Sequence, residues 1–335
     1  MRRMRPIRRI LVAVKDPAAR SLPALGKAAQ LARALGAELV LFQAIAAPLY
    51  LDGDISTLGD ALVVAARNRR QECLAALERR ARRLRRTGLA VTVSAEWDYP
   101  VYEAIIREAG RRSADLIVAE RHAGRYLAAS LLQITDWELL RRSTLPVLLI
   151  GPSGTYRRPV ILTALDPEHS YDKPARLDVD IARTGAALAT RLGGQLHALH
   201  AYVPLPLAAV ARGTLLSAED AARLQAQAAA AARVKLRRLL AKAGVRAARA
   251  HVIGRHPADA IEQLAAQTRS AIVVMGAIAR SGLRRLLIGN TAERVLDHLP
   301  CDVLVVKPPR LPKPVPRARR GARYVGAQPS VPALA

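Results

Sequence analysis

The chain has 335 residues, of which 51% are apolar and 3% aromatic, and its formal net charge is +26. This length and apolar content predict two or so globular domains and exclude an intrinsically disordered chain. The two cysteines, Cys73 and Cys301, exclude a disulfide scaffold and a cysteine zinc site, and the histidines show no metal-ligand spacing.

The N-terminal region starts with basic residues, as secretory signal peptides do. Its apolar run, residues 10–14, is too short for the hydrophobic part of a signal peptide and ends at Lys15. No stretch approaches about 18 consecutive apolar residues, so we expect no membrane span. The expected location is therefore cytoplasmic.

Short apolar runs alternate with longer amphipathic segments along the chain. The runs are rich in Val, Ile and Leu, which is typical of parallel strands covered on both faces. The expected strands are residues 10–14, 38–45, 91–97, 115–119 and 146–150, then 159–165, 195–202, 245–253, 270–275 and 302–307. The expected helices are residues 23–35, 57–86, 102–111 and 137–142, then 177–192, 218–243, 258–267 and 292–298. This alternation predicts an α/β protein with parallel sheets in a Rossmann-like or flavodoxin-like strand order.

The second half of the chain repeats the first. The motifs DLIVA, TDWELLRR and PVLLI reappear as IVVMG, TAERVLDH and DVLVV, and one sequence offset relates Thr135 to Thr291 and Val147 to Val303. A repeat this long predicts two tandem five-stranded domains and not a solenoid, whose repeat is about 20–50 residues. We expect a first domain over residues 1–152, a second over 153–309, and a disordered Pro/Arg-rich tail over 310–335.

The densest positive charge is the run RNRRQECLAALERRARRLRR, residues 67–86. Leu74, Leu77, Ala81 and Leu84 recur at helical spacing, which predicts an amphipathic helix with its arginines in solvent. A surface for nucleic acid or another acidic partner is the alternative, for this run and for the basic tail. Nucleic acid is possible but not favoured, because no DNA- or RNA-binding motif accompanies the charge and the scarce aromatic residues leave few stacking platforms for single strands.

Ligands of open α/β sheets bind beyond the carboxyl ends of the strands, where the strand order reverses. The second half offers two loops there, DPEHS after residue 165 and GAIARSG after residue 275. The arm that starts at the second loop contains Gly276, Gly282, Gly289, Arg280, Arg284 and Arg285. Its glycines permit a close backbone approach to a ligand, and Asn290 or Thr291 can cap a helix start that favours an anion. The arm is not a Walker A loop, because no Lys-Ser/Thr pair follows the last glycine.

The stretch VVMGAIARSGLRRLLIGNTAERVLDHLPCDVLVVKP resembles the C-terminal signature of universal stress proteins. The resemblance extends over residues 8–308. ILVAV at Ile10 and ILTALDP at Ile161 resemble the family's first strand and the loop after it, and YPVYEAI and HPADAI resemble its third-helix start. Two copies in register are similar to the tandem members of the family. The resemblance implies an adenine nucleotide alpha hydrolase-like fold and a role in stress response or survival.

The family's nucleotide-binding members carry the motif Gly-x2-Gly-x9-Gly-Ser/Thr and an Asp after the first strand. The resemblance implies that Gly276 and Gly289 match the first and third glycines and that Ala279 replaces the second. Asp166 matches the Asp that would bond a ribose. The implied nucleotide-binding residues are Asp166, Met275, Gly276, Ala279, Arg280, Gly289, Asn290 and Thr291. ATP or another nucleotide is therefore the cofactor expected for the second domain.

The first half departs from this pattern. The corresponding positions of the arm are Glu120, Ala123, Gln133 and Ile134. Asp16 could match the Asp after the first strand, but Lys15 shifts the spacing by one. We expect no phosphate binding in the first half, where Thr135 and Asp136 instead cap a helix that starts at Trp137.

The combined expectation is a ligand-sensing regulatory protein. An ATP-binding module with weak hydrolysis is one alternative, although no catalytic constellation is present and turnover is not favoured. A carrier of an apolar ligand is another, because the segments 46–66 and 203–217 are strongly apolar. We also expect the two domains to pack on each other through apolar edges, and a homodimer stays open.

Overall fold

A computed structural model describes residues 6–45, 59–121, 135–151, 154–168, 176–202, 218–246, 248–276 and 299–308. The chain divides into two compact units, the first ending at Ile150 and the second beginning at Gly151. The expected helix 292–298 and the expected tail 310–335 lie outside the described residues, as do the loop segments 46–58 and 203–217.

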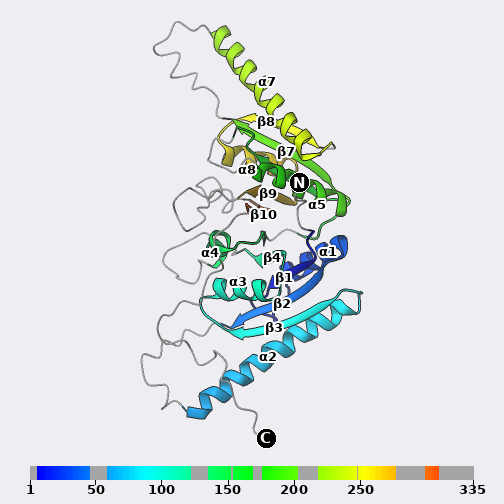
Figure 1. Ribbon diagram of the computed structural model, residues 1–335, viewed down its shortest axis with the longest axis vertical. Helices are drawn as coiled ribbons and strands as arrows, with labels where there is room; N and C mark the ends of the chain where they lie inside the picture. Colours follow the sequence, from blue (N-terminus) through cyan, green and yellow to red (C-terminus); the bar gives the residue numbers. More distant parts are fainter. Residues whose placement is uncertain are drawn as a thin grey trace. The chain divides into compact units, whose positions relative to one another are not determined.

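The first unit is a parallel sheet with helices packed on it (Figure 1). Its strands are β1 (Arg9–Ala13), β2 (Glu38–Ile45), β3 (Val91–Trp97), β4 (Leu116–Glu120) and β5 (Val147–Ile150). Its helices are α1 (Pro23–Leu35), α2 (Gly59–Arg85), α3 (Val101–Arg111) and α4 (Thr135–Arg142). The strand order is β3-β2-β1-β4-β5.

The second unit repeats this plan. Its strands are β6 (Val160–Leu165), β7 (Gln195–Tyr202), β8 (Arg249–Gly254), β9 (Ile272–Gly276) and β10 (Asp302–Val306). The helices that the structure describes here are α5 (Leu177–Arg191), α7 (Ala218–Ala243) and α8 (Pro257–Gln267). The strand order is β10-β9-β6-β7-β8, which is the order of the first unit.

Of the two strand orders expected from the sequence, Rossmann-like and flavodoxin-like, the structure has the Rossmann-like order. In each unit the chain moves outward over three strands and then returns to the other side of the first one. The flavodoxin-like order would instead place the second strand at the edge of the sheet. The strand order therefore reverses between β1 and β4 in the first unit and between β6 and β9 in the second.

The sheets are apolar on both faces because helices cover both. Ile10, Leu11 and Val12 of β1 are completely buried, and so are Val273 and Val274 of β9. Helix α1 packs on β1, β2 and β4, while α3 packs against α4 and β2. The near-continuous apolar runs of the sequence are explained by this double coverage.

Most expected elements lie within two residues of their predicted bounds, and the starts of β8 and α4 differ for identifiable reasons. The strand expected from residue 245 begins at Arg249, because Val245 donates its N–H to Leu240 O at 2.9 Å and thereby closes the end of α7. Helix α4 begins at Thr135 and not at Trp137, so Thr135 and Asp136 belong to its first turn and do not precede it. An acidic residue in the first turn is favoured by the helix dipole.

The segment that opens the second unit is tied to β10. Asp302 accepts a hydrogen bond from the Gly151 N–H at 2.8 Å and another from the Tyr156 hydroxyl at 2.6 Å. Asp302 is fully buried. Burial, followed by the neighbouring Asp302 charge, raises the pKa of Tyr156 well above its ordinary value. The start of the second unit is thus held by side-chain contacts within that unit.

Candidate functional site

The carboxyl ends of β6 and β9 form the edge at which the strand order of the second unit reverses. The register places Ile161 of β6 beside Ile272 of β9, and the two strands run parallel. Asp166 follows the last residue of β6, and Gly276 is the last residue of β9. The structure therefore brings these two predicted site residues to one edge of the sheet, where open α/β sheets bind ligands.

Asp166 is held by the start of helix α5. Its backbone N–H donates to Asp178 Oδ1 at 3.0 Å, and Asp178 is completely buried in the first turn of that helix. Asp166 is itself only 9% exposed. Because its backbone is fixed by this hydrogen bond, the loop after β6 has a defined conformation at the candidate site.

Three further polar groups lie near Asp166. His200 of β7 has Nδ1 3.3 Å from Leu165 O, and Lys235 of α7 has Nζ 2.7 Å from Glu168 Oε1. Burial lowers the pKa of His200, while the nearby Glu168 and Asp166 charges oppose that effect. The hydrogen bond from Lys235 lowers the pKa of Glu168. The edge thus presents carboxylates, an imidazole and a lysine from four different segments.

Sequence reasoning missed His200, Glu168 and Lys235. The histidines were assessed only for metal-ligand spacing, and His200 is spaced three residues from His197 on the opposite face of β7. Pairing β7 with β6 in register would have placed His200 beside Leu165, the residue before Asp166. Lys235 had no comparable signal, because its position depends on how α7 packs.

Gly276 has a packing reason to be glycine. A Cβ at this position would lie 2.8 Å from Leu177 Cδ2 and 3.0 Å from Ile181 Cδ1, both on α5. A side chain there would force the ends of the Leu177 and Ile181 side chains to shift. Met275, the preceding predicted site residue, is buried within β9 opposite Val305.

The remaining predicted site residues lie outside the described residues. They are Ala279, Arg280, Gly289, Asn290 and Thr291. Their role in ligand binding stays a prediction, as does the role of the glycine arm.

Lys307 is a further residue that the sequence did not single out. It follows β10 directly, and the last residue of β10, Val306, pairs with Gly276. Only 7% of Lys307 is exposed, and burial lowers its pKa to about 7. A lysine with this pKa changes its charge near neutral pH, and a neighbouring anion would favour its charged form.

The first unit differs in charge at the two matching positions, with a lysine in place of the aspartate and a glutamate in place of the glycine. Ile10 of β1 pairs with Leu116 of β4, so Lys15 occupies the place of Asp166 and Glu120 that of Gly276. Glu120 Oε1 accepts a hydrogen bond at 3.3 Å from the N–H of Ala24, in the first turn of α1. The chain's own carboxylate therefore lies at the helix start that would otherwise favour a bound anion.

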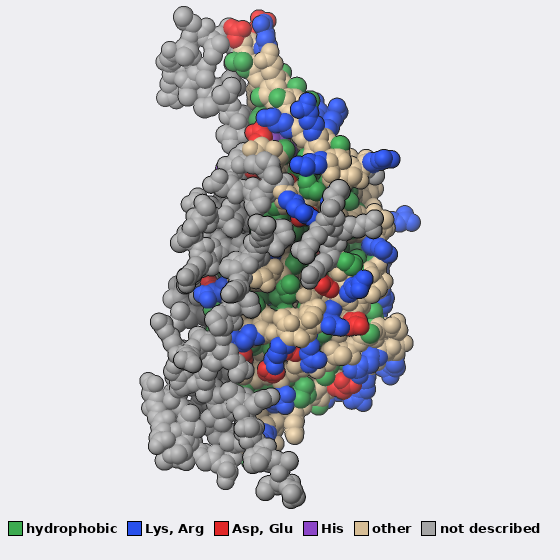
Figure 2. Space-filling view, viewed as in Figure 1, with side chains coloured by type: hydrophobic (Ala, Val, Ile, Leu, Met, Phe, Trp, Pro, Cys, Tyr) green, Lys and Arg blue, Asp and Glu red, His purple; other side chains and the backbone are tan. Residues whose placement is uncertain are grey.

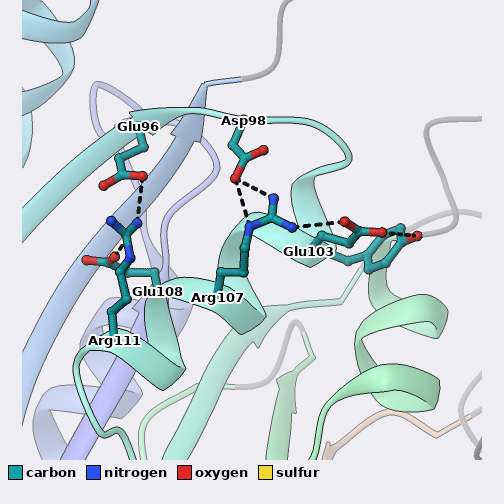
Figure 3. Close-up of polar contacts among 7 residues, drawn as sticks. Glu96, Asp98, Glu103, Arg107, Glu108 and Arg111 are labelled. Atoms are coloured by element: carbon teal, nitrogen blue, oxygen red, sulfur yellow. Dashed lines mark hydrogen bonds and ion pairs between the residues drawn. The ribbon is translucent and has the colours of Figure 1, made fainter. Parts of the chain in front are cut away.

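Further carboxylates of the first unit are neutralised by arginines of α3 (Figure 3). Arg107 donates to Asp98 Oδ2, 3.1 Å from its Nε, and to Glu103 Oε2 at 2.9 Å. Arg111 pairs with Glu96 at 2.6 Å and also with Glu108. These ion pairs lie at the end of β3 and along α3, where they compensate the carboxylates within the first unit.

Among the residues that the structure describes, no group of three or more His, Cys, Asp or Glu side chains could hold a metal ion. None of the helices in the described ranges is long and apolar enough to cross a membrane.

Two consecutive units of one topology, each with a strand-order reversal at its carboxyl edge, define a tandem Rossmann-like α/β protein. The model of the universal stress protein family matches residues 6–151 and 172–307, so the chain belongs to this family. The resemblance inferred from the sequence is confirmed, including its occurrence in two copies.

Similar proteins share the tandem arrangement over nearly their whole length. Universal stress protein E of Escherichia coli strain K12 is 27% identical over 316 residues, which cover 91% of this chain and 96% of that protein. A crystal structure of a putative universal stress protein from Pseudomonas aeruginosa is 28% identical with a TM-score of 0.65, covering 90% and 94% of the two chains. A universal stress protein structure from Archaeoglobus fulgidus, 15% identical with a TM-score of 0.60 over 89% and 98%, shares the fold. The expected similarity to the E-type tandem proteins is thereby confirmed, and with it a family role in the stress response.

Proposed function

We propose that the chain is a ligand-sensing stress protein whose second unit binds ATP or a related nucleotide at the edge formed by β6 and β9. The first unit serves as a partner domain without a nucleotide site. The observation that carries this proposal is the difference in charge between the two edges. Asp166 and Gly276 of the second unit are replaced by Lys15 and Glu120 in the first.

The groups around the second edge suit a nucleotide. An aspartate after the first strand can accept hydrogen bonds from ribose hydroxyls. Lys307 and Lys235 supply positive charge on the same edge. In the first unit, by contrast, Glu120 already accepts a hydrogen bond from the helix start and would repel a phosphate.

The proposal is tested by equilibrium binding of a fluorescent ATP analogue to the full chain. The variant is Asp166→Asn, and its matched control is Asp16→Asn in the first unit. Asn at 166 keeps the backbone hydrogen bond to Asp178, and Asn at 16 can still accept the hydrogen bond from the Ala18 N–H. Both variants therefore remove one negative charge after a first strand and leave the local loop intact.

The expected result is that Asp166→Asn weakens binding about tenfold or more, because a hydrogen bond to a charged group contributes roughly 1.5–3 kcal/mol. Asp16→Asn should leave the dissociation constant unchanged. Failure of the wild type to bind at millimolar nucleotide, or equal losses in both variants, would refute the nucleotide site. Measuring phosphate release in the same samples separates binding from turnover.

A further inference from the structure

The arginines of α2 fall into two groups. The first group is engaged by the protein itself. Arg70 donates to Ala95 O, Arg80 to the carbonyl oxygens of residues 17 and 19, and Arg85 to Val91 O. These arginines fasten the helix to β3 and to the loop after β1.

The second group consists of Arg79, Arg82, Arg83 and Arg86, which we name the arginine ridge. Their spacing places Arg79, Arg82 and Arg83 on one face of the last turns of α2, and Arg86 directly follows the last residue of the helix, with its N–H bonded to Arg82 O. All four side chains are exposed. In the part of the chain that the structure describes, no hydrogen bond or ion pair engages any of the four guanidinium groups. Arg82 acts only through space, on Glu78.

Positive charge on this surface is reinforced by a neighbouring helix. Arg33, in the last turn of α1, donates to Thr87 Oγ1 at 2.8 Å and so lies beside the end of α2. Figure 2 shows Lys and Arg side chains gathered on the surface over α2. Nearby carboxylates do not neutralise the ridge, because Glu78 pairs with Arg85 and Glu72 with Arg69.

The helix dipole accounts for only part of this charge. Basic residues are stabilised in the last turn of a helix, where the partial charge is negative. Arg82 and Arg83 lie in that turn, but Arg79 precedes it. Four neighbouring arginines also repel one another, so an external anion would stabilise the arrangement.

We propose that the arginine ridge binds the phosphate backbone of double-stranded nucleic acid without reading its sequence. Guanidinium groups suit this role because they bond phosphate oxygens in a bidentate manner. Arg79 and Arg86 are separated by about 10 Å along the helix axis. That length corresponds to about three base pairs of duplex, enough for several phosphate contacts.

The composition of α2 favours duplex nucleic acid over the other anionic surfaces. The helix contains no aromatic residue on which unpaired bases could stack. Its apolar face, which includes Leu77 and Ala81, is buried in the unit and is not free to enter a bilayer. The exposed residues of α2 that precede the ridge include the uncharged Asn68, Gln71 and Ala75.

The test measures the anisotropy of a labelled random-sequence DNA of about 20 base pairs, titrated with full-length protein from about 50 to 200 mM salt. The ridge variant combines Arg79→Gln, Arg82→Gln, Arg83→Gln and Arg86→Gln. The matched control removes four exposed positive charges from α7 through Arg233→Gln, Arg237→Gln, Arg238→Gln and Lys242→Gln. Glutamine keeps good helix propensity, so both variants should retain their helices, which circular dichroism checks.

The ridge variant should bind DNA at least about tenfold more weakly and lose roughly 2–4 units from the slope of log K against log salt, one for each phosphate contact removed. The control should stay within about threefold of the wild type. Equal losses in both variants would show that only net charge matters and would overturn the proposal, as would a wild type that does not bind DNA. Ridge-dependent binding to phosphatidylglycerol vesicles without DNA binding would assign the surface to membranes instead.

Discussion

His197, which is buried, and His251, which is partly buried, form a pair on neighbouring strands of the second unit. His251 Nε2 lies 3.2 Å from His197 Nδ1, and the two rings are stacked with centroids 5.0 Å apart. In this contact one ring nitrogen donates and the other accepts, so the two imidazoles cannot both be protonated. Burial lowers the pKa of both, and the Arg249 charge lowers each further.

This pair should make the second unit sensitive to acid. A histidine whose pKa is lowered by folding gives its full stabilisation above the unfolded value of about 6.5 and loses it as the pH falls below that value. The slope can reach about 1.4 kcal/mol per pH unit for each proton taken up only on unfolding. Replacing both residues by Gln should flatten the pH dependence, leaving the part that His200 contributes.

Calorimetry at several pH values checks this expectation. Both tryptophans, Trp97 and Trp137, lie in the first unit, so the transition that fluorescence does not follow belongs to the second. An unchanged slope in the double variant would show that the pair does not control acid stability.

At the level of elements, helix α3 shows how similar ion pairs differ in energetic weight. Arg107 is 15% exposed and joins Asp98, after β3, to Glu103 in the first turn of α3 (Figure 3). Arg111 lies one turn later and its side chain is 51% exposed. Removing one partner of a buried pair leaves an uncompensated charge, whereas water screens an exposed pair.

We therefore expect Arg107→Met to destabilise the first unit by about 3 kcal/mol, because two carboxylates lose their partner in a low-dielectric setting. The matched variant Arg111→Met should cost less than about 1 kcal/mol, since Glu108 keeps Arg112. Urea unfolding followed by tryptophan fluorescence reports the first unit alone. Equal shifts of the two midpoints would contradict this ranking.

The sequence alone predicts those elements whose bounds are set by their own apolar pattern. Strands β2, β3 and β7 and helices α1 and α7 have the bounds that their apolar patterns predicted. The start of β8 was misplaced because residue 245 serves the end of α7, a local competition that apolar content does not reveal. The pattern of α2 gave its buried face correctly, but it did not separate the arginines bonded to carbonyls from those of the ridge.

The candidate site could be predicted only for the residues that lie next to an apolar strand in the sequence. Asp166 and Gly276 could be named because they directly follow or end apolar strands. His200 and Lys235 join them through strand pairing and helix packing, which no local motif encodes. A Cβ at Gly276 would crowd the Leu177 and Ile181 side chains of α5, so this glycine has a packing role besides its place in the predicted motif.

For the whole molecule, duplication has produced two units of one topology and different chemistry. In the first unit, Glu120 occupies the start of α1 and the arginines of α3 pair with nearby carboxylates. The same unit carries the arginine ridge at the end of α2. The second unit keeps Asp166 and Gly276 at the reversal of strand order. We infer that nucleotide sensing and anion binding are divided between the two copies.

Hydrogen–deuterium exchange of the full chain, with and without saturating ATP, tests this division most directly. We expect ATP to slow exchange in peptides that cover residues 160–168, residues 272–276 and the start of α5. Peptides that cover residues 9–15 and 116–120 should be unchanged. Protection of the first unit, or of neither unit, would contradict the assignment of nucleotide binding to the second copy.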